Sequence, residues 1–359
     1  MATTTFKDWT ADELIAELKR RERGEAAKAA GGARSGVAPT RGSRSQDLSS
    51  MPTVDLARAA QDRQRVIYGV DNRKDLYQVG SAPVKKSAAS VVALVKNGDL
   101  TQQADGNFAL ATSSYQADYQ LCGSEPFVNQ PLGCFCSGFL VAQDVIATAG
   151  HCVKSVQDLA GIRFVFGFCM INAQTARTTF PAADVYAGAK LIGRQLAADG
   201  TDWALVRLDR PVVGRTPVSL RKSGKVSSTA RLFVIGHPCG LPQKYAPGAQ
   251  VRDNLSAPFF VANLDTYGGN SGSPVFNATD HKVEGILVRG ENDFVSNGTC
   301  HVSLVCPTTG CRGEDVTRTT VWAAKVPKLV GPKAGATKPG VVRADGVKSR
   351  ASRSRSTKA

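Results

Sequence analysis

The sequence between Val66 and Val326 is a succession of short β-rich runs separated by turn residues, and this pattern limits the possible folds most strongly. Gly, Pro, Asn and Asp stand between the runs, and no long helical period appears. Many short strands with turns between them are typical of an all-β sandwich or barrel. The segment is long for one small barrel and fits two barrels packed together. The runs are ASVVALV, FCSGFLV, DVIATAG, RFVFGF, DWALVRL, ARLFVIG, FFVANL, SPVF and VEGILVR.

The flanking sequence has a different character. Residues 5–23 have apolar positions at helical spacing and predict a short amphipathic helix. The rest of residues 1–60 and all of residues 327–359 are rich in Ala, Gly, Ser and basic residues, so both segments are predicted to be disordered. The expected organisation is an N-terminal helix and linker, a folded domain over residues 61–326 and a C-terminal tail.

The net charge of +15 is concentrated at the C-terminus. The stretch from Lys325 to Ala359 holds ten Lys and Arg and one acidic residue, whereas residues 1–60 hold ten basic and eight acidic residues. The folded domain therefore has nearly ordinary numbers of basic and acidic residues. The basic pI does not by itself indicate a nucleic-acid-binding protein. The tail has no aromatic side chains and no known binding module, so we expect it to be a solvated extension. The alternative is that it binds nucleic acid or an anionic surface.

Membrane spans are not predicted, because no apolar run reaches the roughly 18 residues that a spanning helix needs. Residues 1–30 are polar and charged and lack the apolar core of a secretory signal.

Three segments contain the residue types of a nucleophilic hydrolase: His151 in TAGHC, Asp202 in DWALVRL and Ser271 in GGNSGSPV. Serine is a weak nucleophile at neutral pH and needs an imidazole to take its proton and a buried carboxylate to orient that imidazole. The order His, Asp, Ser excludes the α/β-hydrolase and subtilisin arrangements. Asp199 and Asp209 are the alternative carboxylates in this region.

These segments resemble those of the trypsin-like (chymotrypsin-fold) serine peptidases, in particular the bacterial branch that includes the glutamyl endopeptidases. The D-x-A-L-x-x-L run at Asp202, the GGNSGSPVFN block and the GILVRG strand are similar to the family's aspartate strand, nucleophile loop and substrate-pairing strand. The resemblance covers residues 62–325. It implies two perpendicular six-stranded antiparallel β-barrels with the active site between them, and a Cys136–Cys152 disulfide across the histidine loop.

The resemblance also implies the roles of individual residues. His151 is the expected general base, Asp202 its orienting partner and Ser271 the acylated nucleophile, with the backbone N–H groups of Gly269 and Ser271 as the oxyanion hole. A mechanism of this kind uses no metal or cofactor and acts on polypeptide substrates. We expect a monomer. The alternative is an interaction protein anchored through its basic tail, in which the peptidase domain is incidental.

Substrate preference in this family depends on a residue six positions before the nucleophile, which is Asp265 here. A buried carboxylate at that place would favour Lys or Arg before the cleaved bond. The glutamyl branch has a His on the substrate-pairing strand where this sequence has Leu287. The alternative is that Asp265 binds the backbone or pairs with nearby Arg289. Leu287 and Arg289, with Asp265, are the predicted substrate-binding residues.

The sequence RVIYG at residues 65–69 resembles the activation junction of trypsin-like zymogens. Cleavage after Arg65 would remove residues 1–65 as a pro-segment. Asn270 precedes the nucleophile, however, where animal trypsins have the Asp that binds the new N-terminus. An intact Met1 in fully active protein would refute the hypothesis.

The nine cysteines predict disulfides and at least one free thiol, with Cys169 and Cys239 as the best candidates. The cysteine and histidine cluster at residues 300–311 lacks the spacing of structural zinc sites, so disulfides are favoured over a metal there. His237 and His281 are predicted to be loop or core residues. Disulfides favour an extracytoplasmic location, which conflicts with the expected lack of a signal peptide.

Overall fold

The structure, a computed structural model, describes residues 67–289 and 293–327. The first barrel is closed and antiparallel, in the order β10, β12, β13, β9, β8 and β3. Strand β3 is buried at five of its six positions, as a continuous apolar run predicts for a strand inside a barrel. Its strands are β3 (Val91–Lys96), β8 (Cys136–Ala142), β9 (Val145–Thr148), β10 (Ile162–Phe166), β12 (Val185–Leu196) and β13 (Asp202–Leu208).

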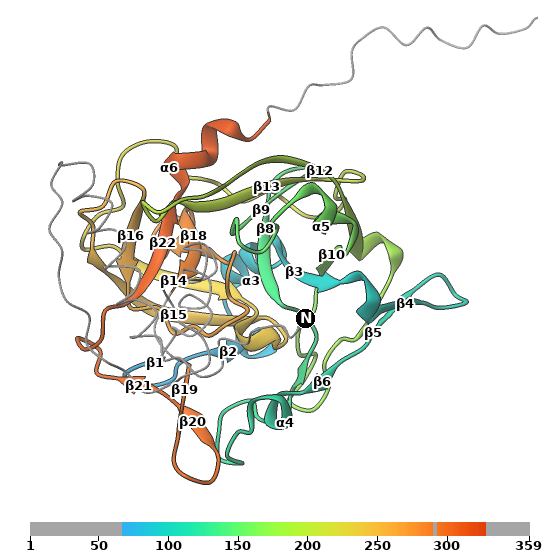
Figure 1. The fold of residues 1–359 in the computed structure, drawn as a ribbon, viewed down its shortest axis with the longest axis horizontal. Helices are drawn as coiled ribbons and strands as arrows, with labels where there is room; N and C mark the ends of the chain where they lie inside the picture. Colours follow the sequence, from blue (N-terminus) through green and yellow to red (C-terminus); the bar gives the residue numbers. More distant parts are fainter. Residues whose placement is uncertain (1–66, 290–292, 328–359) are drawn as a thin grey trace, which may run out of the picture. The chain divides into compact units, whose positions relative to one another are not determined.

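A seven-stranded antiparallel sheet forms the second barrel, in the order β14, β17, β18, β22, β16, β15 and β2. Strand β14 also pairs with β15, so six of the strands close on themselves and β2 extends the edge. Figure 1 shows this barrel on the left and the first on the right. The predicted fold class is confirmed. The strands are β2 (Lys74–Asp75), β14 (Arg231–Gly236), β15 (Lys244–Asp253), β16 (Phe259–Ala262), β17 (Pro274–Asn277), β18 (Val283–Arg289) and β22 (Glu314–Arg318).

The two barrels share one apolar core. Buried Leu94 and Phe139 of the first barrel belong to the same cluster as Phe233 and Phe276 of the second. Trp322 follows β22 in helix α6 (Thr319–Trp322) and packs edge-on against Phe139, with ring centroids 6.0 Å apart. The end of the described chain therefore packs on the first barrel, and this shared core holds the facing edges of the barrels together.

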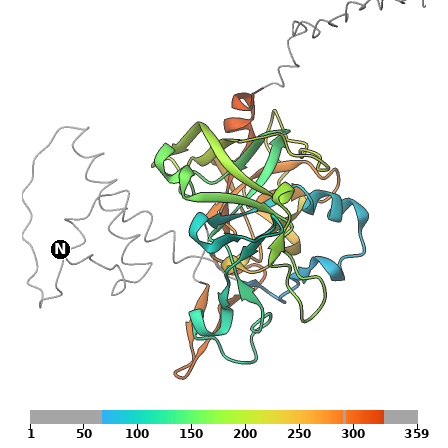
Figure 2. The same cartoon turned by 90° about the vertical axis from the view of Figure 1, so that its right-hand side faces the viewer.

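An insert between β3 and β8, residues 97–133, lies outside the barrels. A disulfide joins its Cys122 to Cys300, next to the hairpin of β19 and β20 in the second barrel's sequence. Figures 1 and 2 show helix α4 of the insert beside this hairpin. The elements of the insert and hairpin are η4 (Asn97–Asp99), β4 (Leu100–Gln102), β5 (Phe108–Leu110), β6 (Ser113–Ser114), α4 (Tyr115–Tyr119), β7 (Pro131–Leu132), β19 (Phe294–Ser296) and β20 (His301–Ser303).

The first described residues are built into the fold. Strand β1 (Ile67–Tyr68) is buried and pairs in parallel with β21 (Val305–Cys306). The predicted junction after Arg65, the predicted helix and linker, and the C-terminal tail all lie outside the described residues. The remaining elements are η3 (Leu76–Gln78), α3 (Ala82–Ala88), α5 (Val156–Ala160), β11 (Thr179–Phe180), η5 (Ala182–Asp184), η6 (Pro238–Gly240) and η7 (Ala323–Lys325). None of the helices within residues 67–289 and 293–327 is long and apolar enough to cross a membrane.

A buried lysine joins the edge strand β2 to the second barrel. Lys244 of β15 forms an ion pair with Asp75 of β2, and its ammonium also donates to the Gln130 side chain at 2.6 Å and to the Pro242 carbonyl at 2.9 Å. Burial lowers the pKa of Lys244 to about 8, and the facing carboxylate of Asp75 opposes that shift. The ion pair thus compensates two charges that the fold takes out of water.

We predict that Lys244→Met lowers the free energy of unfolding by about 3–5 kcal/mol, because the Asp75 carboxylate would stay buried without its cation. Denaturant unfolding followed by tryptophan fluorescence measures the change. The control is Lys282→Met, which removes the exposed pair with Asp280 at 2.8 Å and should cost under about 1 kcal/mol. Equal losses in both variants would contradict the prediction.

Candidate active site

His151 and Asp202 come together at the end of the first barrel. His151 lies three residues after β9, and Asp202 opens β13, the neighbouring strand. The imidazole Nδ1 lies 2.7 Å from Asp202 Oδ2, while Asp202 Oδ1 accepts the backbone N–H groups of Gly150 at 2.6 Å and of His151 at 3.2 Å. The Asp202 N–H donates to Thr317 Oγ1 of β22 at 3.3 Å. Both barrels therefore contribute to the position of this carboxylate.

The Asp202 carboxylate is fully buried, and its environment favours the charged form. Burial alone would raise its pKa. The facing His151 imidazole, the charge of Arg289 and the Gly150 N–H together bring the pKa of Asp202 below its usual value. Because a carboxylate oxygen accepts at Nδ1, that nitrogen carries the proton, and the lone pair of the neutral ring is on Nε2.

Asp199 and Asp209, the alternative carboxylates, have other partners. Asp199 accepts the backbone N–H of Thr201 at 2.8 Å, and Asp209 pairs with Arg210 at 2.9 Å. The carboxylate that contacts the His151 imidazole is therefore that of Asp202.

Ser271 lies on the loop between β16 and β17 and is 4% exposed. Its carbonyl lies 3.7 Å from Cys152 Sγ, which is bridged to Cys136. The two sulfurs and a ring nitrogen of His151 all lie within 4.8 Å of one another. The predicted Cys136–Cys152 disulfide is thus present, and the Ser271 carbonyl and the His151 ring both lie near it. Because its sulfurs are bonded to each other, this cluster is a disulfide and not a ligand set for a metal.

Ser137, which follows Cys136 in β8, binds the loop that contains Ser271. Its N–H donates to the Ser271 carbonyl at 2.8 Å, and its hydroxyl donates to the Gly269 carbonyl at 3.0 Å. The same hydroxyl accepts the His237 N–H at 3.0 Å, and the Ser137 carbonyl accepts from Thr148 Oγ1 at 2.7 Å. Ser137 therefore links strand β8 of the first barrel to two backbone positions of the loop. This role of Ser137 was not predicted from the sequence.

The loop around Ser271 requires glycine at two positions. Gly269 has a φ of +78°, and a Cβ there would lie 2.6 Å from the His237 carbonyl. Gly272 has a φ of +89°, and a Cβ there would collide with the Ser137 carbonyl. Its N–H donates to the Leu287 carbonyl at 2.8 Å. The loop backbone is thus packed against both barrels, which fixes the direction of its N–H groups.

Asp265 is 5% exposed and lies near the start of the same loop. Its Oδ1 accepts the backbone N–H of Tyr68 in β1 at 2.7 Å. Burial raises the pKa of Asp265 to about 7, opposed by the Tyr68 N–H and reinforced by the negative charge of Asp71. The carboxylate is therefore bound by the backbone N–H groups of Tyr68 and Asn72, as one sequence alternative proposed.

The other two predicted substrate-binding residues lie on β18. Leu287 is fully buried in the second barrel, and its backbone N–H donates to the Ser273 carbonyl at 2.9 Å. Arg289 pairs with Asp315 of β22 at 3.2 Å and donates to the Gly200 carbonyl. The alternative in which Arg289 neutralises the carboxylate of the predicted pocket is therefore wrong, because its guanidinium is bound elsewhere.

The two remaining candidate histidines are core and loop residues, as expected. His237 is buried and stacks on Phe168 with ring centroids 5.8 Å apart, and its Nδ1 lies 3.0 Å from the Leu241 carbonyl. Burial lowers the pKa of His237 to about 4, so it is neutral at physiological pH. His281 lies in a turn, with Nδ1 3.3 Å from the Ser87 hydroxyl.

Six cysteines are bridged, including all three of the cluster at residues 300–311. The thiols of Cys169 and Cys239 are free, as predicted, and so is that of Cys134, which the sequence did not single out. The disulfides are Cys122–Cys300, Cys136–Cys152 and Cys306–Cys311.

Comparison with known proteins finds related peptidases. Residues 136–286 match the family model of the trypsin-like peptidase domain, and they contain His151, Asp202 and Ser271. The resemblance to trypsin-like serine peptidases predicted from the sequence is confirmed.

Three curated relatives align with parts of the chain. Secreted RxLR effector protein 73 of Plasmopara viticola is 32% identical over 42% of this chain and 40% of its own length. Glutamyl endopeptidase of Bacillus licheniformis is 26% identical over 41% and 46%. Trypsin-like protease of Streptomyces glaucescens is 25% identical over 49% and 76%. The chain thus spans less than half the length of the first two relatives.

Among solved structures, a Glu endopeptidase is 19% identical and matches 73% of this chain and 100% of its own, with a TM-score of 0.41.

We predict that Ser137→Ala lowers the free energy of unfolding by about 2 kcal/mol, because the buried His237 N–H and Gly269 carbonyl would each lose a partner. Urea unfolding of the full chain measures the loss. Ser223→Ala, in an exposed loop, is the matched control and should change stability by less than about 0.5 kcal/mol. An unchanged midpoint in Ser137→Ala would show that its hydroxyl does not hold the loop.

Proposed function

We propose that this protein is a serine endopeptidase. The observation that carries the proposal is the 2.7 Å contact between His151 Nδ1 and the buried Asp202 carboxylate. The Ser271 carbonyl and a ring nitrogen of His151 both lie near the Cys136–Cys152 disulfide. The Asp202 contact holds the imidazole in one tautomer, and the motifs around Ser271 and His151 support a role for Ser271 as its partner. An imidazole held in this way activates a neighbouring serine hydroxyl for attack on an amide carbonyl.

In the proposed acylation step, His151 Nε2 takes the proton of the Ser271 hydroxyl as Oγ forms a bond to the substrate carbonyl carbon. The N–H groups of Gly269 and Ser271 stabilise the negative charge that develops on the carbonyl oxygen. The imidazolium then donates its proton to the leaving nitrogen, the C–N bond breaks, and an ester on Ser271 remains.

Deacylation repeats these steps with water. His151 takes a proton from a water molecule as the water oxygen attacks the ester carbon. His151 then returns that proton to Ser271 Oγ when the carboxylic acid product is released. Asp202 stays ionised throughout and stabilises the imidazolium, which the lowered pKa of this carboxylate supports.

The acyl-side preference that we propose is for Lys or Arg, through Asp265. This carboxylate is nearly buried, accepts backbone hydrogen bonds from Tyr68 and Asn72 and feels the positive charge of Arg73. Burial still raises its pKa, so a cationic side chain would supply a further charge partner. The name of the Bacillus relative, glutamyl endopeptidase, indicates the opposite charge preference for that protein, so substrates with Glu belong in the same test.

We predict that Ser271→Ala lowers peptide hydrolysis at least about 10³-fold, because the nucleophile is removed while binding remains. Casein and quenched peptide substrates measure the activity, and a serine-directed inhibitor should abolish it in the wild-type protein. The control Ser223→Ala keeps full activity. Unchanged hydrolysis in Ser271→Ala would refute the enzymatic proposal.

We predict that the Lys/Arg preference grows with pH through about 7, because the Asp265 carboxyl ionises there and only its charged form attracts a cation. The measured quantity is the ratio of kcat/KM for an Arg substrate to that for an Ala substrate, in which pH effects common to both substrates cancel. Asp265→Asn should give a low ratio that does not change with pH. Turnover of Glu or Phe substrates without turnover of Arg or Lys would contradict the preference.

A further inference from the structure

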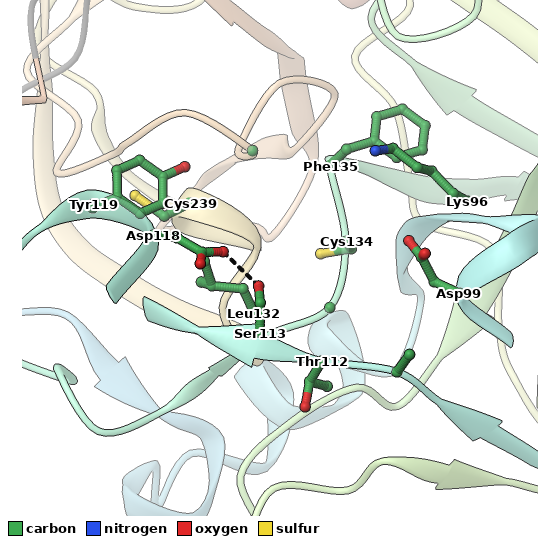
Figure 3. A pocket seen from close by; sticks show the side chains of 13 residues that line it. Lys96, Asp99, Thr112, Ser113, Asp118, Tyr119, Leu132, Cys134, Phe135 and Cys239 are labelled. Atoms are coloured by element: carbon green, nitrogen blue, oxygen red, sulfur yellow. Dashed lines mark hydrogen bonds between the residues drawn. The ribbon is translucent and has the colours of Figure 1, made fainter. Parts of the chain in front are cut away.

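A pocket of about 650 Å³ lies next to the nucleophile loop and belongs largely to the insert at residues 97–133. Figure 3 shows it with Lys96 and Phe135 on one side and Tyr119 and Cys239 on the other. Gly269, two residues before Ser271, also lines it. The volume is sufficient for several amino-acid side chains.

The lining places this pocket on the leaving-group side of the proposed reaction. Phe135 precedes Cys136, whose disulfide partner Cys152 follows His151, the group that protonates the leaving nitrogen. The residues that line the pocket include neither Asp265 nor any part of β18, where the acyl side of a substrate is expected to pair. A chain that continues past the cleaved bond would therefore enter this pocket.

The charges in the pocket favour a cationic occupant. Asp99 and Asp118 line it together with one cation, Lys96. Asp118 accepts the Ser113 hydroxyl at 2.5 Å, and within residues 67–289 and 293–327 no ion pair is found for either aspartate. Two carboxylates without cationic partners give the pocket a net negative lining.

We propose that this pocket binds the substrate residues that follow the cleaved bond and selects a Lys or Arg among them through Asp99 and Asp118. The inference rests on the proposed peptidase function and extends it to the leaving-group side. The insert is then a substrate-selecting element. The Cys122–Cys300 disulfide joins it to the β19–β20 hairpin, and Asp293, just before that hairpin, accepts the Gly268 N–H of the nucleophile loop at 2.9 Å.

The proposal is tested with quenched peptides that share one acyl side, chosen by the substrate panel above. These peptides carry Lys, Ala or Glu at each of the first three positions after the cleaved bond. At one of these positions the wild-type full chain should prefer Lys over Glu about tenfold in kcat/KM. Asp118→Asn and Asp99→Asn should each lower that ratio about threefold. A ratio near one in the wild-type protein would overturn the proposal.

Two controls separate selection from structural damage. Asp105→Asn removes one negative charge from the same insert, outside the pocket lining, and should leave the ratio unchanged. A substrate that carries an aminocoumarin directly after the cleaved bond has no residues to enter the pocket, so its kcat/KM should be equal in all variants. Equal losses on both kinds of substrate in Asp118→Asn and Asp99→Asn would also overturn the proposal.

Binding to the Ser271→Ala full chain tests the pocket without catalysis. Fluorescence anisotropy should give a dissociation constant several-fold lower for the Lys peptide than for the Glu peptide, and Asp118→Asn in this background should reduce that difference. If the wild-type protein hydrolyses nothing, the proposed function fails, while a Lys preference in binding still supports the pocket. Equal dissociation constants for the two peptides would refute the pocket in either case.

Discussion

The structure depends on the compensation of one buried charge, that of Asp202. A carboxylate without solvent is costly to the fold unless several donors face it. Here the donors are the His151 ring, the His151 N–H and the Gly150 N–H, which all belong to one turn. The same interactions that make burial of the charge tolerable also fix the imidazole tautomer, so stability and the geometry proposed for catalysis have a common physical basis.

This charge also connects the two barrels. The Asp202 N–H donates to Thr317 of β22, and the Arg289 cation of β18 contributes to the low pKa of Asp202. Ser137 makes the opposite connection, from β8 to the loop of Ser271. The site therefore forms when the barrels pack together, and neither barrel alone holds the complete geometry.

Apolar composition predicted most of the strands, and the exceptions have identifiable causes. Runs such as DVIATAG and DWALVRL became β9 and β13 because nearly every position in them is buried. The long strands β12 and β15 were not predicted, since they are half exposed and contain Gly or Pro at irregular pairings. Strand β22 was also missed, because its charged residues Glu314, Asp315 and Arg318 are buried through tertiary contacts that composition does not reveal.

The candidate site, too, was predicted only in part from the sequence. Sequence motifs predicted the pairing of His151 with Asp202, because the segments around both residues keep family patterns. The contacts of Ser137 with Gly269 and of Asp265 with Tyr68 join residues 132 and 197 positions apart, and no local pattern encodes them. The pocket of the insert was missed for the same reason.

The Cys122–Cys300 bridge closes a loop of the chain that contains Ser271 and most of both barrels. Its covalent topology has a consequence for a protein proposed to cut polypeptides. A single break of the backbone anywhere between these two cysteines leaves the fragments joined as one molecule. Cuts that the protein makes in its own chain would not change the molecular size measured under oxidising conditions. The fragments would separate only after denaturation together with reduction.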